Sequence, residues 1–303
     1  MKIYLNNLKE DWVVDRLKRE WEIYNHDITI DHPRDADVIW LIAPWLWKNV
    51  RKKYLDSKKV ICSIYHIEEF KMDDSYLNEF NQRDSYVDEY HVISYKTKLQ
   101  LEKLTKKKIT NIPFWVNQDI FYELKEKNTL KEKYGLSKKD YLIGSFQRDS
   151  EGSDPTKPKY IKGPDQFIEI VKYLKTIHDD LTVVLTGKRR AYIMKELSKI
   201  KINYSVFEMV DFDSLNELYN CLDLYIVASR IEGGPQAIVE CSVTKTPIIS
   251  TDVGIASEIL SSKSIFDMTT FKEATPDVEK AYENAREYMI PKGFQKYREM
   301  FML

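Results

Sequence analysis

Two glutamates, Glu232 and Glu240, stand eight positions apart in the stretch SRIEGGPQAIVEC, residues 229–241. An apolar run, residues 222–228, leads into this stretch, and a helical pattern follows its glycine pair. Because helical side chains lean toward the N-terminus, the Glu240 carboxylate is expected to reach back and bind two hydroxyls of a ribose. Glu232, before the turn, is expected to bind hydroxyls of a sugar. The alternative is an ordinary strand–loop–helix in which both carboxylates are solvated.

The turn between the glutamates, Gly233-Gly234-Pro235, favours close contact between the backbone and a ligand. Glycine has no side chain to hold a ligand away, and proline suits the first turn of a helix. The backbone N–H groups of Gln236 and Ala237 are then expected to point at the ligand, at the positive end of the helix dipole. Because helix starts of this kind bind phosphate groups, the turn predicts a diphosphate site.

The elements that position these residues follow a regular rhythm. Short apolar runs alternate with longer segments of helical period, which is typical of βαβ units and a parallel sheet. The expected fold is α/β, with two Rossmann-like doubly wound domains in tandem. We assign residues 1–115 to an N-terminal domain, 116–280 to a C-terminal domain, and 281–303 to a helix that packs back on the first domain. Open parallel sheets bind ligands at the carboxyl ends of their strands, so the site is expected in the cleft between the domains.

Each domain is expected to contain five strands. The predicted elements of the first are strands at 2–5, 28–30, 38–43, 59–65 and 89–94 and helices at 11–24, 47–55, 77–84 and 95–107. Those of the second are strands at 141–146, 181–187, 204–210, 222–229 and 246–252 and helices at 164–178, 191–199, 214–221 and 235–244.

Composition excludes several classes of protein. The 303 residues are 43% apolar and 31% charged, which is typical of a folded globular chain. Lys and Arg number 47 against 48 Asp and Glu, so a general nucleic-acid binder is not expected. Three widely spaced cysteines predict neither disulfides nor a zinc site, and no signal-peptide pattern opens the chain. The cysteines indicate a reducing compartment, so we expect a cytoplasmic protein. We expect no membrane span, since the longest apolar run, 38–47, is too short to cross a bilayer.

The stretch 229–241 resembles the Glu-x7-Glu signature of the retaining nucleotide-sugar glycosyltransferases of the GT-B fold, in particular family four. The continuation KTPIISTDVGIASEIL is similar to the family's G-x-P-V-I-A-T-x-x-G-G-x-x-E-I. WVNQDIF and LNELYNCLDLYIVAS are similar to two further segments, N-G-V-D-x-x-x-F and L-x-x-x-Y-x-x-A-D-x-x-V-x-P-S. The resemblance extends over residues 110–260 and reaches the preceding part only as a pattern of elements. Gly234-Pro235 in place of Phe-Gly, and Lys245 in place of glycine, depart from the family pattern.

This resemblance implies a retaining, metal-independent hexosyltransferase that uses a UDP- or GDP-sugar and no cofactor. The N-terminal domain is then the acceptor side and the C-terminal domain the donor side. The family stabilises the leaving diphosphate with an arginine and a lysine, which match Arg148 in GSFQRDS and Lys162 in YIKGPDQF. An insertion between these two segments leaves Lys157 and Lys159 as alternatives for the lysine. His66, which ends a predicted strand in VICSIYHIEEF, matches a family histidine that faces the donor sugar; the alternative is a structural histidine.

Two other patterns suggest a metal and a membrane. Two Asp-x-Asp triplets, 35–37 and 211–213, bind manganese in the other glycosyltransferase fold class. We interpret Asp213 instead as a helix cap and the first triplet as turn residues, so no metal is expected. Two lysine-rich stretches, 51–59 and 95–108, fit solvated surfaces. The alternative is peripheral docking on anionic lipid, which suits a lipid-linked acceptor.

The resulting prediction is a glycosyltransferase that transfers sugar to a glycan, lipid-linked or other hydroxyl acceptor. The presence of Glu232, Glu240, Arg148 and Lys162 together favours an active enzyme. A GT-B nucleotide-sugar epimerase and a degenerate module that only binds nucleotide sugar stay as alternatives. No Walker loop, Gly-x-Gly-x-x-Gly or Gly-x-Ser-x-Gly motif points to another reaction.

Overall fold

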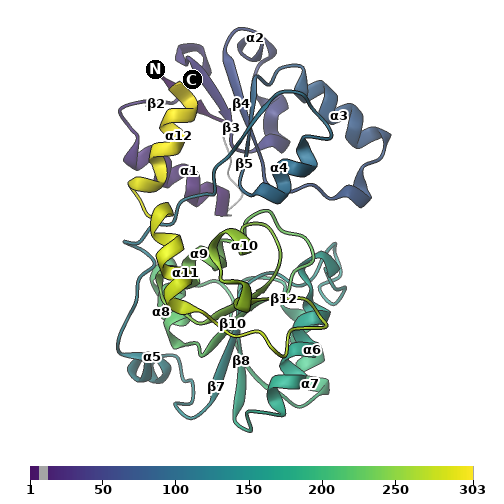
Figure 1. The fold of residues 1–303 in the computed structure, drawn as a ribbon, viewed down its shortest axis with the longest axis vertical. Coiled ribbons are helices and arrows are strands. Elements are labelled where there is room, and N and C mark those ends of the chain that lie inside the picture. Colours follow the sequence, from purple (N-terminus) through teal and green to yellow (C-terminus); the bar gives the residue numbers. More distant parts are fainter. Residues whose placement is uncertain (7–12, 303) are drawn as a thin grey trace. The chain divides into compact units, whose positions relative to one another are not determined.

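The computed structural model describes residues 1–6 and 13–302, which form two compact units (Figure 1). Unit 1 consists of Met1–Trp115 and Ile290–Leu303, and unit 2 of Val116–Met289. The chain returns to unit 1 at Ile290, so residues 281–289, which we grouped with the C-terminal helix, belong to unit 2. No helix in the described part of the chain is long and apolar enough to cross a membrane.

Unit 1 is built on a parallel sheet. In its described part six strands lie in the order β2-β1-β3-β4-β5-β6, and all their pairings are parallel. The interior strands β3 and β5 are buried at every residue, as is typical of a parallel sheet covered on both faces. The strands are β1 (Ile3–Leu5), β2 (Thr29–Ile30), β3 (Val38–Leu41), β4 (Lys59–Ile64), β5 (Glu89–Val92) and β6 (Lys108–Asn111).

The helices of unit 1 differ from the predicted ones at several boundaries. They are α1 (Val13–Tyr24), α2 (Lys52–Leu55), α3 (Asp74–Asp84), α4 (Tyr95–Leu101) and α12 (Lys292–Met302), with 3-10 turns at Pro33–Asp35, Pro44–Asn49 and Glu69–Lys71. The predicted helix 47–55 is wrong, because extended backbone at Val50 and Arg51 separates a 3-10 turn from α2. The start of the predicted helix 11–24 falls at residues 11–12, which lie outside the described residues.

The predicted lysine-rich helix 95–107 is also too long. It ends as α4 at Leu101, and the lysines that follow belong to a turn and to β6. The Thr105 hydroxyl donates to Asp84 Oδ1 at 2.8 Å, and Lys107 Nζ donates to the Val87 carbonyl at 2.5 Å. These contacts with Asp84 at the end of α3 and with Val87 just before β5 hold the turn that leads into β6.

Aromatic rings fill the core of unit 1 beneath α12. Trp21 packs against Trp40 with ring centroids 5.3 Å apart, and Phe301 of α12 lies 5.1 Å from Trp40. Trp115 and Tyr297 are 5.2 Å apart, and all five side chains are at most 2% exposed. Rings of this size bury large apolar areas, so they hold the C-terminal helix against α1 and the sheet (Figure 1).

A closed chain of hydrogen bonds crosses the same core. Trp40 Nε1 donates to Ser63 Oγ at 2.8 Å, and Ser63 Oγ lies 2.8 Å from His91 Nδ1. His91 Nε2 lies 2.7 Å from the Ile112 carbonyl, which also accepts from the Tyr297 hydroxyl at 3.1 Å. A carbonyl only accepts, so Nε2 carries the proton and Nδ1 accepts from serine. Burial lowers the pKa of His91 to about 4, which keeps the ring neutral.

Unit 2 contains a second parallel sheet. Its described strands lie in the order β12-β11-β10-β7-β8-β9. The chain builds outward from β7 to β9 on one side and from β10 to β12 on the other. The predicted α/β class with two doubly wound sheets is thereby confirmed. The strands are β7 (Tyr141–Ser145), β8 (Leu181–Thr186), β9 (Asn203–Phe207), β10 (Leu224–Val227), β11 (Ile248–Thr251) and β12 (Ile265–Phe266).

The helices of unit 2 follow the predicted pattern more closely. They are α5 (Lys127–Lys133), α6 (Pro164–Lys175), α7 (Ala191–Lys199), α8 (Phe212–Cys221), α9 (Gln236–Val243), α10 (Ala256–Ile259) and α11 (Val278–Ala285), with 3-10 turns at Tyr160–Lys162, Ser262–Ser264 and Arg286–Tyr288. The assignment of Asp213 as a cap is wrong. Asp211 is the N-cap of α8, since its Oδ1 accepts from the backbone N–H of Ser214 at 2.8 Å, and Asp213 lies in the first turn.

Candidate functional site

The strand order of unit 2 identifies one place in the sheet where the loops that follow two neighbouring strands diverge. β7 and β10 are neighbours, and the chain leaves them toward opposite sides of the sheet. At such a switch point, the loops at the carboxyl ends separate and leave room for a ligand. The loop after β7 leads to Lys162, and the loop after β10 leads to Glu232. The sheet topology therefore brings these two predicted residues to the same edge.

Lys162 and Glu232 meet directly. Lys162 Nζ lies 2.5 Å from Glu232 Oε1, and Ser229 Oγ donates to the same oxygen at 3.1 Å. The lysine side chain is 23% exposed and the glutamate side chain 11%, so both remain accessible. Ser229 Oγ also lies 3.2 Å from Gln147 Oε1, and Gln147 Nε2 donates to the Lys162 carbonyl at 2.9 Å. The arrangement holds a cation and a carboxylate side by side at the ligand-binding edge of the sheet.

The backbone beside Lys162 is shaped by close packing. Gly163 has φ +61°, and a Cβ there would lie 1.6 Å from the Ala228 carbonyl oxygen at the end of β10. Only glycine fits this contact, which sets the start of α6 against β10. Arg230 reinforces the contact through a paired interaction with Asp165, in which Nη2 and Oδ2 are 2.7 Å apart. The position of Lys162 is therefore fixed from both sides.

The glycine turn after Glu232 is packed in the same way. Gly254 has φ +51°, and a Cβ on it would lie 2.2 Å from the Gly233 carbonyl oxygen. Pro235 is the N-cap of α9, and no side chain caps this helix start. Gly233, Gly234, Gln236 and Ala237 all lie in the turn or the first turn of α9. The structure thus places the predicted phosphate-binding residues at the start of a helix, beside the Lys162–Glu232 pair.

Glu240 lies in the second turn of α9 and is 4% exposed. Its Oε2 accepts a hydrogen bond from the Tyr219 hydroxyl of α8 at 2.8 Å. Burial, and then the neighbouring Glu240 charge, raise the pKa of Tyr219 well above its usual value, so the tyrosine stays a donor. Sequence reasoning did not foresee Tyr219 as the partner of Glu240, because the two are brought together only by the packing of α8 on α9.

Arg148 lies in the loop after β7, and its side chain is exposed. Within the described residues, no hydrogen bond or ion pair involves that side chain. Of the two alternative lysines, Lys157 lies 3.5 Å from Glu151 at the surface, whereas the Lys159 backbone N–H donates to the Asp149 carbonyl at 2.8 Å. Lys162 is the lysine whose side chain contacts Glu232.

A buried ion pair lies next to Arg148 and was missed from the sequence. Arg190 Nε lies 3.2 Å from Asp149 Oδ2, and the two side chains are 1% and 2% exposed. Burial raises the pKa of Asp149 to about 6, although Arg190 and the backbone N–H groups at the start of α7 lower it in part. Its two residues are forty-one positions apart in the sequence. The only local signal for the pair is that Asp149 directly follows Arg148.

The remaining predicted site residue, His66, belongs to unit 1 and follows β4. Its Nε2 lies 3.3 Å from Glu68 Oε1, and Lys71 Nζ lies 2.5 Å from the other oxygen of Glu68. Burial raises the pKa of Glu68, but hydrogen bonds from Lys71 and His66 outweigh it and hold that pKa below its usual range. The other eight predicted site residues all lie in unit 2.

The first Asp-x-Asp triplet has ordinary local partners. The Asp37 carboxylate accepts from the Lys2 backbone N–H at 2.7 Å, and Asp35 pairs with Arg34 at 3.1 Å. Among the described residues, no group of three or more His, Cys, Asp or Glu side chains is placed to hold a metal ion. Asp35 and Asp37 thus contact neighbouring groups of the chain, as Asp211 does at the start of α8.

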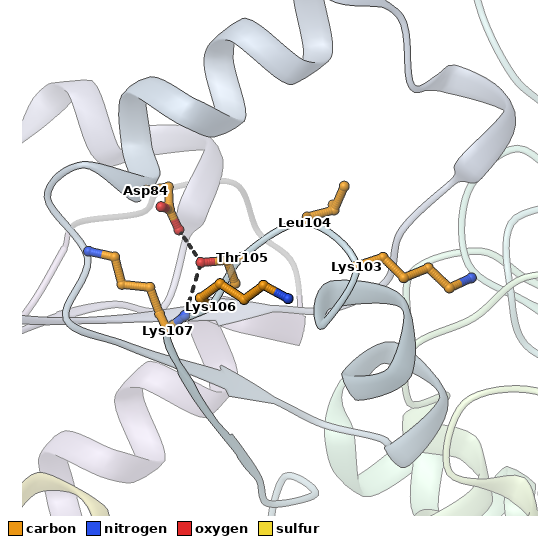
Figure 2. Close-up of a pocket in the computed structure, with 6 residues that line it drawn as sticks. All are labelled: Asp84, Lys103, Leu104, Thr105, Lys106 and Lys107. Carbon is orange, nitrogen blue, oxygen red and sulfur yellow. Dashed lines mark hydrogen bonds between the residues drawn. The ribbon is translucent and has the colours of Figure 1, made fainter.

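The lysine-rich turn after α4 lines a pocket of about 490 Å³ in unit 1 (Figure 2). The Thr105 hydroxyl lies between Asp84 and the backbone N–H of Lys107 in this pocket. Lys103 Nζ lies 3.4 Å from Glu69, so it is partly engaged by an acidic neighbour. The residues around the pocket are Asp84, Lys103, Leu104, Thr105, Lys106 and Lys107.

Comparisons with known proteins agree with this architecture. Residues 157–296 match the family model of "Glycosyl transferases group 1". The lipopolysaccharide core biosynthesis mannosyltransferase LpsB of Rhizobium meliloti is 22% identical over 146 residues. That match covers 46% of this chain and 39% of the relative, so it spans well under half of the relative's length.

Solved structures resemble the whole chain. HepE of Anabaena in complex with UDP has a TM-score of 0.77 at 12% identity and covers 100% of both chains. Sucrose-phosphate synthase of Thermosynechococcus elongatus has a TM-score of 0.69 at 13% identity, with 98% of this chain and 81% of that chain covered. This chain therefore has the GT-B fold, and its residues 157–296 match the group 1 glycosyl transferases.

Proposed function

We propose that the protein is a retaining glycosyltransferase that transfers a sugar from a nucleoside-diphosphate donor to a hydroxyl of an acceptor. The observation that carries this proposal is the Lys162–Glu232 pair, which lies at the switch point of the unit 2 sheet. A cation there can bind a phosphate, while a carboxylate beside it can bind sugar hydroxyls. The solved structures of HepE with UDP and with UDP-glucose support a donor of this class.

The donor diphosphate binds between the cations and a helix start in this proposal. The backbone N–H groups at the start of α9 are directed at the phosphates, and the Gly233-Gly234 turn lets the diphosphate approach them. Lys162 exchanges its contact with Glu232 for a phosphate oxygen, and Glu232 is released toward the sugar. Glu240, oriented by Tyr219, accepts hydrogen bonds from the ribose. UDP- and GDP-sugars both carry these groups.

The transfer itself requires charge stabilisation at the leaving group. The bond between the anomeric carbon and the diphosphate oxygen breaks, and a bond to the acceptor oxygen forms on the same face of the sugar. The acceptor proton passes to the leaving diphosphate, whose negative charge is stabilised by Arg148 and Lys162. These two cations replace a metal ion, so we propose a metal-independent reaction without a cofactor. We assign acceptor binding to unit 1, where His66 follows β4, and propose a carbohydrate or lipid-linked acceptor.

A panel of UDP- and GDP-sugars tests the proposal. One donor is expected to raise the melting temperature of the protein and to be consumed when an acceptor is supplied, with retained anomeric configuration by NMR. Release of free sugar without any acceptor would point instead to the epimerase, and binding without turnover to the degenerate module. If none of the donors binds, the proposal fails.

Peripheral membrane contact is a separate part of the proposal. Lys106 is exposed at the lysine-rich turn, so it can meet an anionic headgroup. Sedimentation with phosphatidylcholine vesicles, with and without phosphatidylglycerol, measures this contact. We expect binding only to the anionic vesicles and less binding by Lys106→Glu. Equal binding to both kinds of vesicle, or to neither, would contradict it.

A further inference from the structure

Arg148 lies between Gln147 and Asp149, and the buried side chain of Arg190 contacts both of these neighbours. Arg190 is 3% exposed, and its Nη1 donates to the backbone carbonyl of Gln147. Its Nε lies 3.2 Å from the carboxylate of Asp149. The residues before and after Arg148 are therefore fixed by the same guanidinium.

The same side chain also binds the ends of two strands. Arg190 Nη2 donates to Ser145 Oγ at the end of β7, and Nη1 donates to the Thr186 carbonyl at the end of β8, both at 3.3 Å. A guanidinium presents five donors in a rigid plane, whereas a lysine ammonium is a compact charge on a flexible stem. Arg190 can thus set the orientation of the turn relative to the sheet edge in a way that lysine cannot.

The backbone next to Arg190 carries a second, independent sign of constraint. Arg189 has φ +66°, in the left-handed region that side chains other than glycine rarely adopt. In this conformation its carbonyl accepts from the Asp149 backbone N–H at 3.2 Å and from Ser150 Oγ at 3.1 Å. Strained conformations persist where the surroundings enforce them, and they cluster at functional sites. The two hydrogen bonds of the Arg189 carbonyl join this residue to the turn that carries Arg148.

Stability alone does not account for this arrangement. Removing an ion pair from water is costly, and apolar residues of similar size often stabilise a fold as well or better. The constrained turn ends in the exposed side chain of Arg148, which no other side chain of the described residues contacts through a hydrogen bond or ion pair. A fixed backbone with an available cation is the arrangement that an anionic ligand requires.

We propose that the Asp149–Arg190 pair positions Arg148 for the leaving diphosphate, so that both are positioning residues of the reaction. This inference rests on the function proposed above. Neither residue touches the substrate; each acts on the rate through the place and direction of the Arg148 guanidinium.

A double-mutant cycle tests the inference. Arg148→Ala is expected to lower kcat about a hundredfold, as for loss of one donor to a developing charge. Arg190→Lys is expected to lower kcat about tenfold or more, because small displacements of a catalytic group are costly, while the donor KM changes little. The double variant should be no slower than Arg148→Ala alone. Multiplied effects would show that Arg190 acts independently of Arg148 and would overturn the inference.

A matched control separates positioning from a general effect of removing an arginine. Arg298 in unit 1 also binds through a fork, with Asn25 and Asp27 each 2.7 Å away, and Arg298→Lys should leave kcat unchanged. Should Arg190→Lys fail to fold, Asp149→Asn takes its place in the same cycle, with the same expected non-additivity.

Hydrogen exchange decides the structural part without any turnover. Arg190→Lys is expected to speed exchange of the Asp149 backbone N–H, measured on peptides covering residues 146–151, and to leave exchange in the strands of the unit 2 sheet unchanged. Unaltered protection there would overturn the inference even if the enzyme were slower. If the native chain turns over no donor, the proposed function fails, while this measurement still decides whether Arg190 holds the turn.

Discussion

The two units each contain a network of polar groups, and the two networks end differently. In unit 1 the chain from Trp40 through Ser63 and His91 to the Ile112 carbonyl is closed at both ends, and its members are fully paired within the core. In unit 2 the polar chain from Gln147 through Ser229 ends at the Lys162–Glu232 pair, which is still accessible. A closed network stabilises a fold, whereas a network that ends in accessible charges leaves them ready for a ligand.

The same difference distinguishes two histidines of unit 1, one within a strand and one just after a strand. His91 lies within β5 and is 0% exposed, and its two ring nitrogens are satisfied by the core. His66 follows the end of β4, and its side chain is 35% exposed. A histidine inside a buried strand is thus structural here, while one at the carboxyl end of a strand is available for chemistry. The predictions below test this comparison.

The largest expected effect concerns the pH dependence of stability at His91. Its pKa of about 4 in the folded chain lies below the unfolded value of 6.5, so the unfolded chain binds a proton first. The contribution is fully present above pH 6.5 and is lost as pH falls toward 4, about 3 kcal/mol in total. Urea unfolding between pH 7 and pH 4.5 measures this slope. His91→Asn should flatten it, even if the variant is less stable at every pH.

The exposed His26 provides the matched control for this slope. His26→Asn should unfold with the same pH dependence as the native chain. A native slope retained in His91→Asn would show that the closed network does not carry the pH dependence, and the contrast between the units would weaken.

The next largest effect is expected on turnover, at the Lys162–Glu232 pair where the unit 2 network ends. Lys162→Ala is expected to lower turnover about a hundredfold, because a cation that stabilises the leaving diphosphate is lost. Lys157→Ala, which removes a surface lysine paired with Glu151, should leave turnover unchanged. Initial rates at saturating donor measure both. The reverse result would assign the family lysine to Lys157 and would remove Lys162 from the reaction.

These contrasts show what the sequence could predict. Strongly periodic segments were placed well: α7 spans the predicted residues 191–199, and every strand predicted in unit 2 is present. β6 was missed, because its sequence KITN is polar at both ends and follows a run of lysines typical of a helix surface. Its pairing with β5, a tertiary contact, decides its structure.

The candidate site shows the same limit of prediction from local sequence. The glycine turn, Glu232 and Lys162 were found because local spacing and the family resemblance mark them. Arg190 and Tyr219 were not, because each acts through a partner distant in the sequence. Side chains that contact a ligand can be marked by local pattern, whereas those that orient them are revealed only when the sheet and helices are packed.

A smaller effect is expected at the buried Glu240 of α9. Glu240→Ala should weaken binding of the free nucleoside diphosphate by about 1.5–3 kcal/mol, as for loss of a hydrogen bond made by a charged group. Tyr219→Phe removes only the hydroxyl that orients Glu240 and should weaken binding less. Isothermal titration calorimetry with UDP and GDP measures both losses. Unchanged affinity in Glu240→Ala would place the ribose elsewhere.

The smallest effect is expected at the Asp-x-Asp triplet 211–213, where the comparison predicts a structural role. Asp211 caps α8 through the Ser214 backbone N–H, so Asp211→Ala should lower the melting temperature by a few degrees and leave turnover intact. Asp213→Ala removes an exposed first-turn residue and should change the melting temperature less. Activity should also survive excess EDTA, since Arg148 and Lys162 are proposed to supply the charge at the leaving group. If EDTA abolishes transfer and manganese restores it, the assignment of that charge to the two side chains fails, and a metal must take their place.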